Sequence, residues 1–169
     1  MDLSLTMQDT AREERRSETC EVFTPQETVR KMLDKLPDEM FEASKTFLDN
    51  SCGNGNMLVE VLMKKLEMTP KSKRVNGLPK CGLLPFYVKS DYVIDCVKSL
   101  YGTDMMEDNV KECKERIFNI AWKCINHMGV GTLMLLDELQ KQVIDRQIIC
   151  TKMEDWDYER WCPIYEKLF

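Results

Sequence analysis

The sequence predicts an α/β fold of about three parallel strands flanked by helices, and two observations lead to this prediction. Short apolar runs alternate along the chain with longer segments whose apolar residues recur at helical spacing. Strands separated by helices pair in parallel, because each helix returns the chain to the same end of the sheet. A length of 169 residues, with 43% hydrophobic and 31% charged residues, suits one globular domain.

Three apolar runs are the predicted strands, at residues 45–51, 100–105 and 146–153. Amphipathic spacing predicts helices over residues 25–36, 56–67, 90–100, 107–128 and 132–145. Thr24 is the expected N-cap of the first helix, with Pro25 at its first position and Pro37 at its end. Ser90 or Asp91 is the expected cap of the helix over 90–100.

The domain prediction follows from composition along the chain. Residues 1–20 are polar and charged and are expected to form a flexible N-terminal arm. Residues 21–169 are expected to form the single domain, interrupted by an irregular loop at 68–89 that is rich in proline and glycine. The basic stretch 64–80 fits either a solvated loop or a loop that contacts a nucleic-acid backbone.

Composition also limits the function classes. Eight cysteines occur with no CxxC pair and only one histidine, so we expect free thiols and no metal site. Cys96, Cys113 and Cys150 lie in apolar segments and are expected to pack as small hydrophobic residues. No apolar run spans a membrane and the start does not resemble a signal peptide, so the expected location is the cytoplasm.

The chemistry is predicted at the ends of the first two strands. Asp49 follows an apolar run, and Gly53 and Gly55 then precede a helix, which is typical of a loop that approaches a ligand closely. Asp104 ends the second strand, where its carboxylate can accept hydrogen bonds from ribose hydroxyls. Met105 follows and can cover the face of an adenine ring. The sequence therefore predicts a nucleoside site.

Three segments resemble the cofactor-binding motifs of small phage-type, adenine-specific DNA methyltransferases. They are "VFTPQETVRKML", "FLDNSCGNGNMLVEVLMKKL" and "LYGTDMMEDNVKECKERI", in the family's order, and the likeness covers residues 21–65 and 98–118. The resemblance implies a truncated Rossmann-like, class I methyltransferase fold, with S-adenosylmethionine as cofactor and DNA as substrate. It also implies the host cytoplasm if the protein is phage-encoded.

The resemblance implies three groups of cofactor-binding residues. The Phe-Thr-Pro segment would pack over the methionine part of the cofactor, the glycine loop would wrap its amino acid moiety, and the second strand end would hold the nucleoside. In this order the implied residues are Phe23, Thr24 and Pro25; Asp49, Ser51, Cys52, Gly53 and Gly55; and Asp104 and Met105.

The chain departs from the family where catalysis would occur. The family's Asp/Asn-Pro-Pro-Tyr/Phe motif is absent, and the nearest segment, "CPIY" at 162–165, is not expected to replace it, so no catalytic residue is predicted. Lys152 stands where the family has an adenine-binding Asp, with Glu154 or Asp155 as the nearby acids.

Few residues remain for the further strands of a complete methyltransferase sheet, so the first strand is expected to form an open edge. A second copy, a partner chain or the segment 156–169 would cover this edge. The apolar residues of that segment are Trp156, Trp161, Ile164, Leu168 and Phe169. Two functions follow: a DNA adenine methyltransferase that acts with a partner, or a non-catalytic regulatory relative, a pseudo-enzyme.

Overall fold

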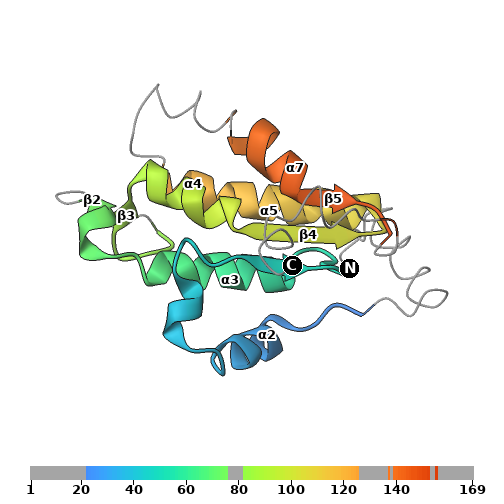
Figure 1. Cartoon of the computed structure of the whole chain (residues 1–169), viewed down its shortest axis with the longest axis horizontal. Coiled ribbons are helices and arrows are strands. Elements are labelled where there is room, and N and C mark those ends of the chain that lie inside the picture. Colours follow the sequence, from blue (N-terminus) through green and yellow to red (C-terminus); the bar gives the residue numbers. More distant parts are fainter. Residues whose placement is uncertain (1–21, 76–81, 126–136, 138, 153–154, 156–169) are drawn as a thin grey trace, which may run out of the picture.

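Three short apolar runs pair in parallel and form the central sheet (Figure 1). The strands are β1 (Phe47–Asp49), β4 (Leu100–Asp104) and β5 (Ile148–Cys150), with β4 in the middle. The computed structural model describes residues 22–75, 82–125, 137, 139–152 and 155. Within these residues, the predicted α/β class and parallel pairing are confirmed.

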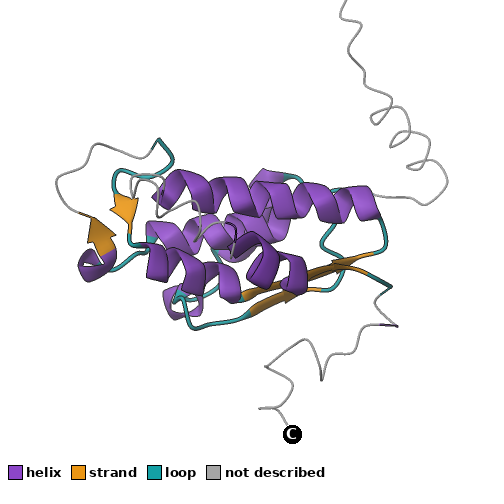
Figure 2. Cartoon of the chain, turned by 90° about the horizontal axis from the view of Figure 1, so that it is seen from above, coloured by secondary structure: helices purple, strands orange, loops and turns teal. Residues whose placement is uncertain are grey.

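Helices connect the strands and gather on one side of the sheet (Figure 2). The α-helices are α2 (Gln26–Leu33), α3 (Asn56–Glu67), α4 (Ser90–Lys98), α5 (Glu107–Ile125) and α7 (Asp145–Gln147). The other helical segments are the 3₁₀ turns η1 (Asp38–Phe41) and η2 (Lys71–Lys73) and the π-helix η3 (Leu139–Ile144). Each longer helix buries an apolar stripe, as its sequence period requires.

The strand register brings two chain segments together at the carboxyl edge of the sheet. Asp49 lies opposite Gly102, so β4 continues to Asp104 beyond the end of β1. The chain that follows β1 stays beside this extension, because the N–H of Cys52 donates to the carbonyl of Thr103 at 2.8 Å. The glycine loop is therefore fixed to the second strand.

Helix α3 lies at the centre of the packing and has the bounds predicted from the sequence, 56–67. It contacts β1, β4 and the helices α2, α4 and α5. Leu58, Leu62 and Leu66 are fully buried, and each contributes about 1.5–3 kcal/mol by leaving water. Because α3 begins at the glycine loop, this packing holds one side of the candidate site in place.

Helix α2 is shorter than predicted. Pro25 has an extended conformation, with ψ of 142°, so the helix begins after it and Pro25 takes the N-cap position expected for Thr24. The helix ends at Leu33 because the next turn tightens: the N–H of Lys35 donates to the carbonyl of Met32, three residues back.

Two other predicted boundaries are wrong. Lys89 takes the N-cap position of α4, and Asp91 instead pairs with Lys73 at 2.6 Å.

The described part of the predicted helix 132–145 is the π-helix η3, followed by α7. Helix α7 includes Arg146 and Gln147, which were predicted as strand, and the Gln147 amide donates to the carbonyl of Lys98. This hydrogen bond between distant residues stabilises the helical turn, so β5 begins only at Ile148.

The predicted irregular loop 68–89 contains regular structure. The strands β2 (Arg74–Val75) and β3 (Tyr87–Val88) pair antiparallel, although residues 76–81 lie outside the described part. The Arg74 guanidinium stacks on the Phe86 ring at 3.9 Å and its Nε donates to the carbonyl of Thr69. These contacts between residues far apart in the loop order it in a way that its composition does not indicate.

The cysteines that the structure describes are free thiols. Cys96 and Cys113 are buried, as predicted. Cys150 is also a free thiol, as predicted, and it is exposed at the carboxyl end of β5, where the chain leaves the sheet.

Two adjacent lysines of α3 have opposite environments. Lys65 is 0% exposed, and its ammonium donates to the carbonyls of Glu42 and Lys45 at 2.8 and 2.6 Å. Burial lowers the pKa of Lys65 to about 8. Lys64 forms an ion pair with Asp34, whose side chain is largely exposed. Lys65 therefore fastens the segment before β1 to α3, whereas Lys64 is partly exposed and pairs with a carboxylate at the surface.

We expect Lys65→Met to lower the free energy of unfolding by about 2 kcal/mol, because two partly buried hydrogen bonds from a charged donor are lost. Lys64→Met is the matched control and should cost less than about 1 kcal/mol, as is usual for an exposed ion pair. Urea denaturation of both variants measures the difference. Equal losses would show that the buried ammonium has no special role.

Candidate functional site

A pocket of about 170 Å³ lies at the carboxyl edge of the sheet, beside the glycine loop. Several predicted cofactor residues share it: Phe23, Thr24, Asp49, Ser51, Cys52 and Gly53. Residues that the sequence did not single out complete the lining: Val22, Val29, Asn54, Asn56 and Met57. The fold therefore brings the Phe-Thr-Pro segment and the glycine loop to one place.

The remaining predicted residues do not line this pocket. Pro25 starts α2, with its carbonyl accepting the N–H groups of Thr28 and Val29. Met105 is 62% exposed at the end of β4, beside the site but outside the pocket.

Asp104 acts on the pocket through the loop. Its Oδ2 accepts the N–H of Gly53 at 2.9 Å, and its Oδ1 accepts the N–H of Met106 at 2.9 Å. Oδ1 also lies 3.4 Å from the side-chain nitrogen of Asn109. This one carboxylate therefore joins the loop after β1 to the start of α5.

The two loop glycines are required by packing within the chain. At Gly53, with φ of 50°, an added Cβ would lie 3.1 Å from the Phe23 ring. At Gly55, with φ of 84°, it would lie 2.5 Å from the Cys113 sulfur on α5. A side chain at Gly55 would also be strained by the left-handed backbone. The structure thus explains Gly55 by its packing against α5.

Two neighbouring carboxylates give the site its electrostatic character. Burial raises the pKa of Asp49, and the nearby charge of Asp104 raises it further, while the N–H of Ser51 donates to Asp49 and opposes this shift. Within the described residues, neither carboxylate forms an ion pair. Such a pair of acids favours a ligand that brings positive charge and hydrogen-bond donors.

Cys52 is the buried member of the glycine loop. The pKa of the Cys52 thiol is raised, mainly by a hydrogen bond with Cys113 and also by burial. The sulfur thus stays a neutral thiol at physiological pH, and thiolate chemistry at this position is not supported.

Side chains from α5 hold the loop from the other side. Arg116 donates to the carbonyl of Asn54 and to the side-chain oxygen of Asn56, and the Asn54 amide donates to Glu112 at 3.1 Å. Asn54 and Asn56 flank Gly55, so their position in the motif was the signal that could have identified them. Glu112 and Arg116 lie 58 and 62 residues further along the chain than Asn54, and no local pattern indicates their role.

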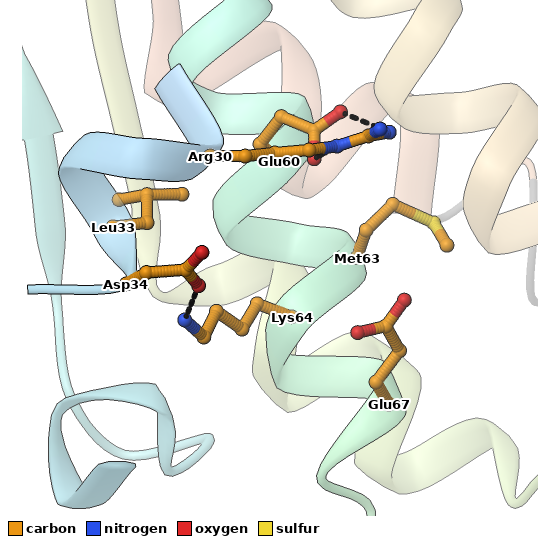
Figure 3. A pocket seen from close by; sticks show the side chains of 7 residues that line it. All are labelled: Arg30, Leu33, Asp34, Glu60, Met63, Lys64 and Glu67. Carbon is orange, nitrogen blue, oxygen red and sulfur yellow. Dashed lines mark hydrogen bonds and ion pairs between the residues drawn. The ribbon is translucent and has the colours of Figure 1, made fainter. Parts of the chain in front are cut away.

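A second pocket, of about 380 Å³, lies between α2 and α3 (Figure 3). Its charges largely satisfy one another: Arg30 pairs with the buried Glu60, which also accepts from Gln26, and Asp34 pairs with Lys64. These contacts fasten α2 to α3. Because the Phe-Thr-Pro segment leads into α2, they also help to hold that segment beside the glycine loop.

A third hollow, of about 800 Å³, lies at the opposite end of the sheet. Residues just before β1 and β4 line it, including Lys45, Thr46, Lys98 and Ser99. Ligands of open parallel sheets bind at the carboxyl ends of the strands, so this hollow is not the candidate site.

Lys152 lies just after β5, and the N–H of Asp155 donates to its carbonyl. The N–H of Thr151 donates to the carbonyl of Asp104. The turn that follows β5 therefore begins beside the carboxyl end of β4. Glu154 and the segments 156–169 and 162–165 lie outside the described residues.

The described residues contain no cluster of side chains suited to hold a metal ion. Among the helices of the same residues, none has the length and apolar character needed to cross a membrane. Searches of protein-family models, curated proteins and solved structures found no match to this chain.

We expect Gly55→Ala to destabilise the protein by roughly 2–4 kcal/mol, because the new methyl group collides with Cys113 in addition to straining the backbone. Gly82→Ala is the matched control. Gly82 has a similar φ of 86° but open space around it, so only the backbone strain of about 1 kcal/mol applies. Chemical denaturation compares the two, and equal losses would exclude the packing explanation.

We expect Asp49→Asn to stabilise the ligand-free protein at pH 7. The folded-state pKa of Asp49 is raised, so its contribution to stability is greatest at low pH and is lost as pH rises through that pKa. Asparagine keeps the acceptor for Ser51 and removes the charge. Thermal unfolding at pH 7 and at pH 3 measures the gain, which should vanish at the lower pH. Asp95→Asn on the exposed face of α4 is the control and should show no such gain.

Proposed function

We propose that this chain is an S-adenosylmethionine-binding domain of the methyltransferase type. The observation that supports this most is the pair of carboxylates, Asp49 and Asp104, which lie together without a cation of the described chain beside them. S-adenosylmethionine carries a sulfonium, an ammonium and ribose hydroxyls, so it offers both the charge and the donors that such a site lacks. When bound, it supplies an electrophilic methyl group.

Each part of the site has a role in this proposal. Asp49 would pair with the ammonium, the loop around Gly53 would enclose the amino acid moiety, and Asp104 would accept from the ribose. Phe23 would cover the methionine part, and Met105, which is exposed, would lie against the adenine.

The size of the pocket sets a condition on binding. Its volume of about 170 Å³ is below the roughly 300–1,000 Å³ of typical small-molecule sites, so the ligand would have to widen it. The Phe23 ring lies next to Gly53, and a rotation of this side chain would widen the pocket. Ribose hydroxyls would share Asp104 with the N–H of Gly53, since a carboxylate has about four acceptor positions.

The proposed activity is adenine methylation of DNA together with a partner chain. The sequence contains no Asp/Asn-Pro-Pro-Tyr segment to hold the target adenine, so a partner would supply it. Strand β1 offers one place for such a partner, because it pairs only with β4 among the described strands and exposes Leu48. The alternative is a non-catalytic regulatory module. Lys152, in place of an adenine-binding acid, favours that alternative.

Isothermal calorimetry tests the cofactor proposal. We expect S-adenosylmethionine to bind the full chain, and Asp104→Asn to weaken binding at least tenfold through loss of a charged acceptor. Asp95→Asn removes the same charge far from the pocket and should leave the affinity within about twofold of the parent. No heat with the parent protein, at ligand concentrations up to millimolar, would end the proposal.

Transfer of labelled methyl groups to unmethylated DNA tests whether the chain is a complete enzyme by itself. We expect no label above a no-protein control for the chain alone, because the target-base motif is absent. Labelled DNA that disappears with Asp104→Asn would instead establish the chain as a complete enzyme.

A further inference from the structure

Arg116 on α5 makes two short hydrogen bonds to the beginning of α3. Its Nη1 donates to the carbonyl of Asn54 at 2.7 Å and to the Oδ1 of Asn56 at 2.8 Å. Both asparagines line the pocket beside the glycine loop. A guanidinium that donates to two oxygens forms charge-assisted bonds, which are stronger than bonds between neutral groups.

The side chain of Asn56 continues this contact to the opposite side of the pocket. Its Nδ2 donates to the carbonyl of Thr24 at 2.9 Å. With its oxygen facing Arg116 and its nitrogen facing Thr24, the amide satisfies both neighbours in one orientation. We call this chain of contacts the Arg116–Asn56–Thr24 bridge.

The bridge connects three segments of the chain. Thr24 belongs to the segment between Phe23 and α2, Asn56 is the first residue of α3, and Arg116 lies near the middle of α5. The separations of 32 and 60 residues along the chain mean that only the tertiary structure creates it.

We propose that Arg116 is a positioning residue for the cofactor, acting through Asn56 on the Phe23–Thr24 segment. By fixing Thr24, the bridge sets how closely Phe23 approaches Gly53 and thus the width of the methionine end of the pocket. Arg116 does not itself line the pocket. This inference rests on the proposed function.

Calorimetry on the full chain tests the bridge with two ligands. Arg116→Met keeps an unbranched side chain about as long as the aliphatic part of arginine and removes the guanidinium donors. We expect it to weaken S-adenosylmethionine about tenfold, the effect of losing roughly one net hydrogen bond, while adenosine binds within about twofold of the parent. Adenosine lacks the amino acid part, so the width of that end should not affect it.

Three further variants sharpen the test. Arg116→Lys retains a charged donor group and should recover part of the affinity for S-adenosylmethionine. Asn56→Ala breaks the link to Thr24 and leaves the bond from Arg116 to Asn54, so it should repeat the selective loss. Lys111→Met removes one positive charge from an exposed position of the same helix and should bind both ligands like the parent.

The outcomes separate this inference from the proposed function. Equal weakening of both ligands in Arg116→Met, or no weakening in either bridge variant, would overturn the positioning role. If the parent binds no S-adenosylmethionine, the proposed function fails together with the positioning role. Hydrogen exchange on the ligand-free protein then tests the bridge as a structural contact. Faster exchange at residues 22–29 in Arg116→Met and Asn56→Ala than in Lys111→Met would support that contact, and equal rates would refute it.

Discussion

The carboxylate of Asp104 is the contact on which the candidate site depends. It accepts the N–H of Gly53 from the loop after β1 and the N–H of Met106 at the start of α5. Backbone N–H groups bonded to a carboxylate fix a loop more firmly than a turn alone, because the acceptor is charged. The ends of two strands and the start of a helix thus become one unit. An acid at this position serves the fold whether or not a ligand is bound.

The Asp104 carboxylate also places a second negative charge near Asp49, and no ion pair within the described residues balances either charge. Asp49 lies near Asp104, and burial together with this neighbour raises the pKa of Asp49. Several described acids elsewhere have cationic partners: Glu60 has Arg30, Asp34 has Lys64 and Asp91 has Lys73. The contrast is informative, because burying an unpaired carboxylate costs stability that the fold offsets elsewhere. A cationic ligand would remove that cost on binding.

The basic residues show how internal contacts change the meaning of a charge pattern. The stretch 64–80 is the most basic region of the chain, yet Lys65 is buried against carbonyls and Arg74 is stacked on Phe86. Lys64 and Lys73 form ion pairs with acids of other segments. These four cations of the stretch therefore make contacts within the domain.

The sequence by itself determined the class of the fold, the full extent of α3 and the place of the glycine loop, because apolar period and glycine position are local properties. It also located Phe23, Asp49 and Gly53, which share one pocket. Only the tertiary structure decided why Gly55 is a glycine and how the loop is held. The collision at Gly55 comes from Cys113, and the hydrogen bonds to the loop come from Arg116 on the same distant helix. Contacts between residues so far apart depend on how helices pack, and no window of sequence contains that information.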